Sequence, residues 1–304
     1  MRLLFIFLDG IGLGENDPET NPFARARMPN LNRLLEGRSL LRDAAPFQGE
    51  YASLLAVDAA VGVHGLPQSA TGQAILLTGI NIPAELGYHY GPKPNPEVAA
   101  YLKEATLFSR FTKEGRKAAL LNAYPPRYFD GIDSGKRLYS SIPWAVINAG
   151  LPLFRHPDLF AGHALSADFT GEGWRTMLGF SEAPVMGAAQ AGAKLAALAK
   201  MYDFSLFEYW ASDYAGHKQQ MDNAISLMET FDEVLGGLTE AWDDDGLILV
   251  TSDHGNMDDL STRKHTAAHV PALVIGEKTA RNAFTRDLKD LTDIAPAIWK
   301  TVMG

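Results

Sequence analysis

The sequence contains no cysteine among its 304 residues. This absence excludes disulfides, thiolate zinc sites, iron–sulfur ligation and cysteine nucleophiles together. Long apolar runs are also lacking. The N-terminal run Leu3–Leu8 is too short for a secretory signal and ends at Asp9. No stretch approaches the roughly 20 apolar residues that span a bilayer. We therefore expect a soluble, cytoplasmic protein.

Positive charge is scarce, with 27 basic against 36 acidic side chains and a net charge of −9. This balance argues against nucleic acid or an anionic membrane as the main partner. It would also repel a phosphorylated substrate unless a bound metal reversed the local field. At 46% hydrophobic residues the chain can bury a substantial core.

Short apolar runs alternate with helical patterns along the chain. Such runs are buried on both faces, which is typical of a parallel sheet covered by helices. The sequence therefore predicts an α/β fold, a doubly wound, mostly parallel sheet with helices on both faces. The expected strands are Leu3–Leu8, Ala118–Ala123, Ser205–Trp210, Leu247–Val250 and Ala272–Ile275. The expected helices are Pro29–Leu35, Ala70–Leu77, Pro96–Lys113, Ala188–Met201, Lys218–Trp242 and Thr285–Met303.

Neither linker composition nor an internal repeat divides the chain, so we expect a single α/β domain over residues 1–304. Residues 81–184 are less regular and hold many of the prolines and glycines. We expect loops and short elements there, laid over the core, from which a small lid over the site could be built.

Three expected strands run into aspartates, namely Asp9, Asp213 and Asp253. Ligands of open parallel sheets bind beyond the carboxyl ends of the strands. Three carboxylates at one edge would repel each other unless a cation lay among them. A single aspartate after a strand is ordinary loop chemistry, but three such ends indicate a metal site.

Histidines accompany two of these aspartates. His217 lies four residues after Asp213, His254 follows Asp253 directly, and His265 comes shortly afterwards. Imidazole together with carboxylate favours Zn or Mn over the purely oxygen-ligated Ca or Mg. The other five histidines lack such neighbours and are interpreted as surface or hydrogen-bonded residues: His64, His89, His156, His163 and His269.

Ser69 precedes an apolar helical run. Its hydroxyl has two interpretations. It could cap the helix by accepting from a free backbone N–H. Alternatively, a serine at a helix N-terminus lies where phosphate binds, and a metal that lowers its pKa makes it a nucleophile. The residues alone leave both interpretations open.

The order of these motifs resembles the alkaline phosphatase superfamily, and in particular its metalloenzyme branch with cofactor-independent phosphoglycerate mutase and phosphopentomutase. The resemblance covers residues 1–79 and 204–304, with supporting segments at 28–34 and 291–296. The matching motifs are Asp9-Gly10, Ser69-x-x-Gly72, Asp213-x-x-x-His217, Asp253-His254-Gly255-Asn256 and His265-Thr-x-x-His269-Val-Pro.

The resemblance implies two divalent ions, Mn²⁺ or Zn²⁺. One would be held by Asp213, His217 and His265, and the other by Asp9, Ser69, Asp253 and His254. It also implies that Ser69 is the nucleophile and passes through a phosphoserine. Thr71 is the runner-up, although the spacing to Gly72 favours Ser69. Gln73 and Asn256 are candidates for hydrogen bonds to the substrate or to metal ligands.

Two departures from the mutases bear on the activity. Gln73 stands where the mutases usually have histidine, and the span from Ser69 to Asp213 is too short for their full inserted cap. If water is not excluded, a phosphoserine is hydrolysed instead of transferring its phosphate. We therefore expect a metal-dependent phosphohydrolase acting on a small phosphate ester.

Two alternatives stay open: a phosphomutase of the phosphoglycerate or pentose phosphate type with a reduced cap, and a metal-binding protein without turnover. The substrate, the native metal and the oligomeric state are not predicted. Basic residues that could contact the phosphate also read as ordinary surface charges: Lys93, Arg127, Lys136, Arg137, Arg263 and Lys264.

Overall fold

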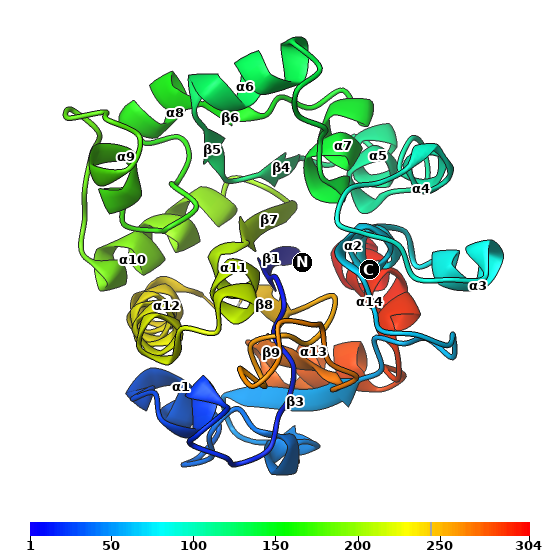
Figure 1. Cartoon of the computed structure of the whole chain (residues 1–304), viewed down its shortest axis with the longest axis vertical. Coiled ribbons are helices and arrows are strands. Elements are labelled where there is room, and N and C mark those ends of the chain that lie inside the picture. Colours follow the sequence, from blue (N-terminus) through cyan, green and yellow to red (C-terminus); the bar gives the residue numbers. More distant parts are fainter. Residues whose placement is uncertain (244) are drawn as a thin grey trace.

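The computed structural model describes residues 1–243 and 245–304, and within them a seven-stranded sheet runs in the order β2-β3-β9-β8-β1-β7-β4 (Figure 1). Four neighbouring strands are parallel: β8 (Gly246–Thr251), β1 (Arg2–Leu8), β7 (Phe204–Tyr209) and β4 (Ala118–Leu120). The other three pair antiparallel: β9 (Val270–Ile275) with β8, β3 (Ala52–Val57) with β9, and β2 (Phe47–Gln48) with β3. The prediction of a largely parallel α/β sheet is confirmed.

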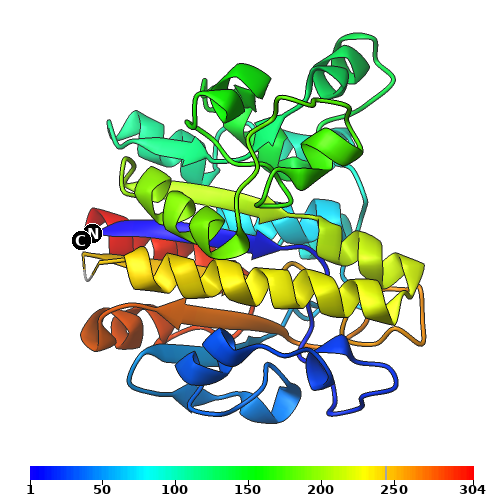
Figure 2. The same cartoon turned by 90° about the vertical axis from the view of Figure 1, so that its left-hand side faces the viewer.

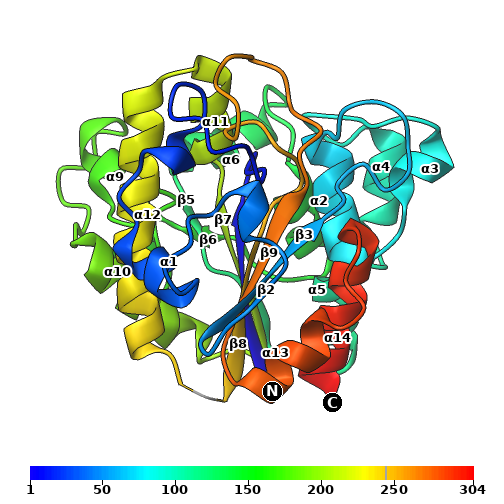
Figure 3. The same cartoon turned by 90° about the horizontal axis from the view of Figure 1, so that it is seen from below.

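Helices cover both faces of this sheet (Figures 1 and 3). One face carries α1 (Pro29–Leu34), α10 (Ala188–Ala199) and α12 (Met221–Ala241). The other carries α2 (Ser69–Thr78), α5 (Leu107–Lys113), α7 (Ser141–Asn148), α13 (Lys278–Thr285) and α14 (Ile294–Met303). Side chains of β1 alternate between the two cores, with Ile6 on the first and Phe5 and Phe7 on the second. Burial on both faces explains why this strand is apolar throughout.

Several expected elements differ from the structure. The helix expected over Pro96–Lys113 is two helices, α4 (Pro96–Tyr101) and α5, because Thr106 accepts a hydrogen bond from Ser109 N and starts α5 afresh. The helix expected over Thr285–Met303 is the end of α13 followed by η3 (Leu291–Asp293) and α14. The short helix α11 (Ala211–Lys218) precedes α12, and β2 and β3 were not predicted.

Residues 81–184 hold short helices and strands joined by loops. They include α3 (Ile82–Leu86), α6 (Pro126–Asp133), α8 (His156–Phe160) and α9 (Glu172–Thr176) as well as α4, α5 and α7. They also supply β4 of the main sheet and a separate parallel pair, β5 (Ala123–Tyr124) with β6 (Phe154–Arg155). Figure 2 shows this region at the β4 end of the molecule. A lid role for it stays a prediction, as does the single-domain interpretation.

The two termini lie at one edge of the sheet, and the loop between β8 and β9 lies at the opposite edge (Figure 3). That loop edge is where β1, β7 and β8 end. Two further 3-10 turns, η1 (Pro22–Ala24) and η2 (Arg42–Ala44), belong to the segment between β1 and β2. No helix of the described residues is both long and apolar enough to span a membrane.

Candidate metal centre

The aspartates and histidines predicted from the sequence converge at the edge where the parallel strands end. Asp9 follows β1, Asp213 lies in the first turn of α11 after β7, and Asp253 follows β8. The histidines come from two of the same segments. Helix α11 carries His217 one turn after Asp213, and the β8–β9 loop carries His254 and His265.

Asp213, His217 and His265 form one cluster, whose ligand atoms lie within 4.8 Å of one another. His217 Nε2 lies 3.3 Å from one oxygen of Asp213, and His265 Nε2 lies 3.9 Å from the other. Each ring points its Nδ1 at a backbone carbonyl 2.7 Å away, that of Arg263 for His217 and that of Pro67 for His265. A carbonyl only accepts, so Nδ1 carries the proton and Nε2 keeps a free lone pair beside the carboxylate.

A second cluster joins Asp9, Asp213 and His254, again within 4.8 Å. His254 Nε2 lies 3.4 Å from Asp9 Oδ1, 3.6 Å from Asp253 Oδ2 and 3.0 Å from Ser69 Oγ. Of the four residues that the resemblance assigns to one ion, three therefore surround the Nε2 of the fourth, His254. Asp213 lies with both clusters, whereas the resemblance assigns it to one ion only.

The electrostatics of this site suit a cation. Burial, reinforced by neighbouring carboxylates, raises the pKa of Asp253 to about 7 and that of Asp9 well above its usual range. Burial lowers the pKa of His254 to about 4, so its ring is neutral at pH 7. Within the described residues, Asp9 Oδ1, Asp213 Oδ1 and Asp253 Oδ2 are buried without a hydrogen-bond partner.

Unpartnered buried carboxylate oxygens are costly, and a divalent cation is the partner that would satisfy several at once. The mixed set of imidazole nitrogens and carboxylate oxygens suits Zn or Mn. The residues present therefore fit the implied metals.

Ser69 is the first residue of α2, and the residue in the N-cap position is Gln68, whose side chain makes no capping bond. The capping interpretation of Ser69 therefore does not apply. Because His254 Nδ1 faces the carbonyl of Gly255 at 3.3 Å, Nε2 is free to accept a hydrogen bond from the Ser69 hydroxyl. Gly72 allows this close approach, since a Cβ there would lie 2.8 Å from the Asp253 Cβ.

Thr71 uses its hydroxyl differently. It is 3.2 Å from the carbonyl of Gln68 and 3.3 Å from that of Tyr90, and it accepts from Tyr90 N at 3.2 Å. All three contacts are with the backbone, and they fasten the segment around Tyr90 to α2. This hydroxyl is occupied structurally, unlike that of Ser69.

Gln73 and Asn256 adjoin metal-ligand candidates. Gln73 Nε2 lies 3.5 Å from Asp9 Oδ2, and Asn256 Nδ2 lies 3.2 Å from His217 Nδ1. Their amide oxygens are buried without partners in the described part of the chain. Substrate binding by either residue stays a prediction.

Sequence reasoning missed two side chains near the site. Asp258 accepts from Thr266 Oγ1 at 2.8 Å and so holds the loop that carries His265. Glu208 is buried within β7, and the signal was available, since it is the one charged residue in an otherwise apolar strand. Its surroundings are described below.

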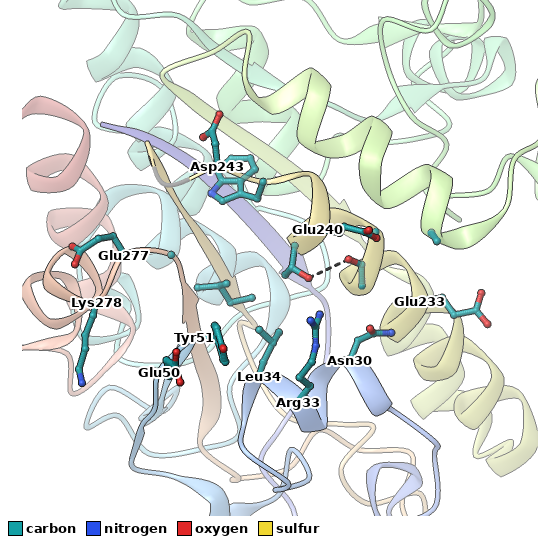
Figure 4. Close-up of a pocket in the computed structure, with 17 residues that line it drawn as sticks. Asn30, Arg33, Leu34, Glu50, Tyr51, Glu233, Glu240, Asp243, Glu277 and Lys278 are labelled. Carbon is teal, nitrogen blue, oxygen red and sulfur yellow. Dashed lines mark hydrogen bonds between the residues drawn. The ribbon is translucent and has the colours of Figure 1, made fainter.

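A groove of about 1050 Å³ opens elsewhere, between α1, the end of α12 and the turn at Glu50 and Tyr51 (Figure 4). It is lined by Ile275 at the end of β9 and by Trp242 just before β8, so it lies at the edge opposite the metal centre. None of the predicted site residues lines it.

The fold and this site define a family. The family model of the metalloenzyme superfamily matches residues 151–303, half of the chain, and the chain belongs to this superfamily. Among solved structures, the alkaline phosphatase of the Antarctic bacterium TAB5 is similar over 99% of this chain and 98% of its own, with a TM-score of 0.57 and 14% identity. The phosphoglycerate mutase of Leishmania mexicana is similar over 99% and 95%, with a TM-score of 0.51 and 13% identity. These likenesses confirm the alkaline-phosphatase-like fold.

Among curated proteins, the chain is similar to 2,3-bisphosphoglycerate-independent phosphoglycerate mutases. It is 34% identical to that of Desulforudis audaxviator over an alignment of 122 residues, which covers 38% of this chain and 24% of the relative. It is 30% identical to that of Trichormus variabilis over an alignment of 181 residues, which covers 50% of this chain and 34% of the relative. The chain thus spans a quarter to a third of these relatives' length.

Proposed function

We propose that this metalloenzyme is a metal-dependent phosphohydrolase that acts on a small phosphate ester through a phosphoserine at Ser69. The observation that carries the proposal is the 3.0 Å contact between Ser69 Oγ and His254 Nε2, at the start of a helix and beside unpartnered buried carboxylate oxygens. A structural capping role leaves this contact unexplained.

In this proposal, Asp213, His217 and His265 would hold one divalent ion, and Asp9, Asp253 and His254 with Ser69 would hold the other. Two such ions, when bound, lower the pKa of a coordinated hydroxyl and neutralise phosphoryl oxygens. Zn and Mn both suit the donor set. The position of Asp213 in both clusters would couple the two sites.

The chain's own residues would then carry out two displacements. Ser69 Oγ attacks phosphorus, the bond from phosphorus to the leaving oxygen breaks, and the alcohol departs with a proton. Water next attacks the phosphoserine, the bond from phosphorus to Ser69 Oγ breaks, and the serine regains its proton as phosphate leaves. The N-terminus of α2 contributes a partial positive charge where negative charge gathers.

Hydrolysis is favoured over transfer by how the segment between Ser69 and Asp213 is used. Its elements β4, α5 and α7 belong to the main sheet and its core. Apart from α7, only the part from β5 to α9 is left to build a cover that excludes water. The phosphomutase alternative is supported by the similarity to mutases in sequence, and the alternative of metal binding without turnover remains testable with the same variants.

The test is phosphate release from a panel of monoesters by metal-stripped protein reloaded with Mn²⁺ or Zn²⁺. We expect release that requires metal and falls by at least about a thousandfold in Ser69→Ala. Ser226→Ala, an exposed serine on α12, is the matched control and should be unaffected. Isomerisation of a labelled sugar phosphate without release would support the mutase, and unchanged activity in Ser69→Ala would exclude the serine as nucleophile.

A further inference from the structure

Glu208 lies beside the metal centre but has no part in the proposed displacements. It pairs in register with Phe7 of β1, two residues before Asp9, and the alternation of β7 turns it to the same face of the sheet as α2. Its carboxylate is buried, with 7% of the residue exposed, and its charge contributes to raising the pKa of Asp9. The position therefore adjoins the reacting groups.

Two tyrosines line this position. The hydroxyl of Tyr124 donates to the Glu208 carboxylate, and the side chain of Asn122 brackets the Glu208 backbone with two hydrogen bonds of 2.8 Å. The ring of Tyr128 lies 4.5 Å from that of Tyr124. The Tyr128 hydroxyl is buried without a partner among the described residues, and so offers a donor that nothing uses.

Two cations complete the surroundings. The guanidinium of Arg137 lies 5.2 Å from the centre of the Tyr128 ring. Lys93 is partly buried, and that burial lowers its pKa although the charges of Glu208 and Asp9 oppose the shift. Lys93 is therefore within electrostatic reach of both acids.

The segment that carries Lys93 is fastened to the nucleophile helix. Thr71 N donates to the carbonyl of Tyr90 at 3.0 Å, and a Cβ on Gly91 would lie 3.2 Å from Ser69 N. Lys93 follows two residues later. The backbone contacts of Tyr90 and Gly91 with α2 therefore keep the backbone of Lys93 near the N-terminus of that helix.

We propose that Lys93, Arg137 and the Tyr128 hydroxyl bind the leaving group of the substrate, and that this leaving group carries a second acidic function, a carboxylate or a phosphate. Glu208 and Tyr124 are positioning residues, because the Glu208 carboxylate is already occupied by its hydrogen bond from the Tyr124 hydroxyl. Lys93, Arg137 and the Tyr128 hydroxyl are then all donors, and an acidic leaving group supplies acceptor oxygens for them. The inference rests on the proposed function, since it assigns a substrate class to the same site.

Three probes share a two-carbon unit and test the acidic function: 2-phosphoglycolate carries a carboxylate, ethane-1,2-diyl bisphosphate a second phosphate, and 2-hydroxyethyl phosphate a neutral hydroxyl. Charge-assisted hydrogen bonds predict that metal-loaded protein turns over at least one acidic probe with a kcat/KM about tenfold or more above that of the neutral probe. Whichever acidic probe is preferred identifies the acidic function.

Lys93→Gln, Arg137→Gln and Tyr128→Phe should each reduce this preference, the ratio of kcat/KM for the acidic probe to that for the neutral probe, by about tenfold. Arg137→Lys should restore part of the preference. Lys113→Gln, an exposed lysine at the end of α5, is the matched control and should leave it intact.

The two ways of failing are separable. If the wild type hydrolyses all three probes equally and the variants do not alter the ratio, the leaving-group assignment is overturned and the phosphohydrolase stands. If no probe is hydrolysed, calorimetric titration of metal-loaded Ser69→Ala with the same probes still tests the assignment. Tighter binding of an acidic probe, lost in Lys93→Gln, supports it, and equal binding overturns it.

Discussion

The imidazole rings of His254 and His265 are stacked, with ring centres 3.6 Å apart and planes inclined by 12°. The two residues are assigned to different ions, yet they share one wall of the centre. Each turns its Nδ1 to a backbone carbonyl, that of Gly255 or that of Pro67. The stack therefore holds the Nε2 atoms of both rings on the same side of the centre. The loss of one ring should weaken metal binding at both ion sites.

Replacing His265 by alanine should lower the bound metal from two ions per chain to about one and weaken the remaining ion by roughly tenfold or more. The physical reason is that His254 loses the ring that packs against it. Metal content after dialysis measures the effect. His163→Ala, an exposed histidine, is the control. Retention of two ions by His265→Ala would contradict the assignment.

The metal-free protein should become less stable between pH 6.5 and pH 8. Asp253, whose pKa is raised to about 7, and Asp9, whose pKa burial raises well above its usual range, favour the folded state while protonated. That contribution is present below the unfolded pKa of about 4 and is lost as pH rises through the folded pKa.

The buried histidines oppose this trend most strongly below about pH 6.5, and their effect fades over about one pH unit above it as the unfolded chain loses the imidazolium protons. We expect the melting temperature in chelator to fall by about 2–4 °C over this range, and the fall to vanish when Mn²⁺ is bound. Asp253→Asn should flatten the metal-free profile. A metal-free protein that gains stability toward pH 8 would refute the argument.

Arg281 should be a strong determinant of stability although it lies far from the metal centre. Its side chain is completely buried and donates to Ser53 Oγ and to the carbonyls of Gly49, Glu50 and Gly276. Arg281→Met removes these donors and leaves buried acceptors unpaired, at a cost of about 3 kcal/mol or more. Denaturant unfolding measures this cost, and the exposed Arg286→Met should cost less than about 0.5 kcal/mol.

Asp232 of α12 caps α1, which has no side-chain cap of its own. Its carboxylate accepts from Leu31 N at 2.7 Å and from Asn30 N at 3.1 Å. Asp232→Ala should therefore destabilise the protein by about 1–2 kcal/mol in denaturant unfolding. Its exposed neighbour on the same helix, Glu233, provides the control, and an equal effect of Glu233→Ala would show that the cap does not matter.

Gly72→Ala should separate α2 from the β8–β9 loop. The added Cβ would lie 2.8 Å from the Cβ and 2.9 Å from the carbonyl oxygen of Asp253. We expect a loss of about 1–3 kcal/mol and a marked fall in bound metal, since Ser69 moves with the helix. In the control Gly187→Ala the added Cβ has no neighbour closer than 3.8 Å, so neither stability nor bound metal should fall.

The parts of the fold that the sequence predicted are those whose burial is uniform. Strands β1, β7 and β8 are covered on both faces, and each is a mostly apolar run. Strand β3 was missed although it is equally necessary to the sheet, because its apolar run is partly exposed and it pairs antiparallel with β9. Helix boundaries were wrong where a single residue such as Thr106 interrupts a helical pattern by capping the next helix.

The metal centre was predictable because its residues lie in short motifs at strand ends. Contacts made across longer separations were not predicted: Thr71 N bonds to the carbonyl of Tyr90, and Asp213 lies with both clusters. Such contacts depend on how loops pack, and loop packing leaves no periodic pattern in the sequence from which it could be predicted.

Strand β4 pairs only with β7 among the described strands, so the chain leaves the main sheet at its margin and returns through α10 to β7. Apart from α7, which packs in the core, the segment from β5 to α9 is thus attached at a place where no other strand must be displaced. A lineage could exchange this segment for one of different size while the seven strands, and the metal centre that they carry, kept their arrangement. Under the proposed function, the metal centre would then act on substrates with different leaving groups, because the segment that contacts the leaving group can change independently of the sheet.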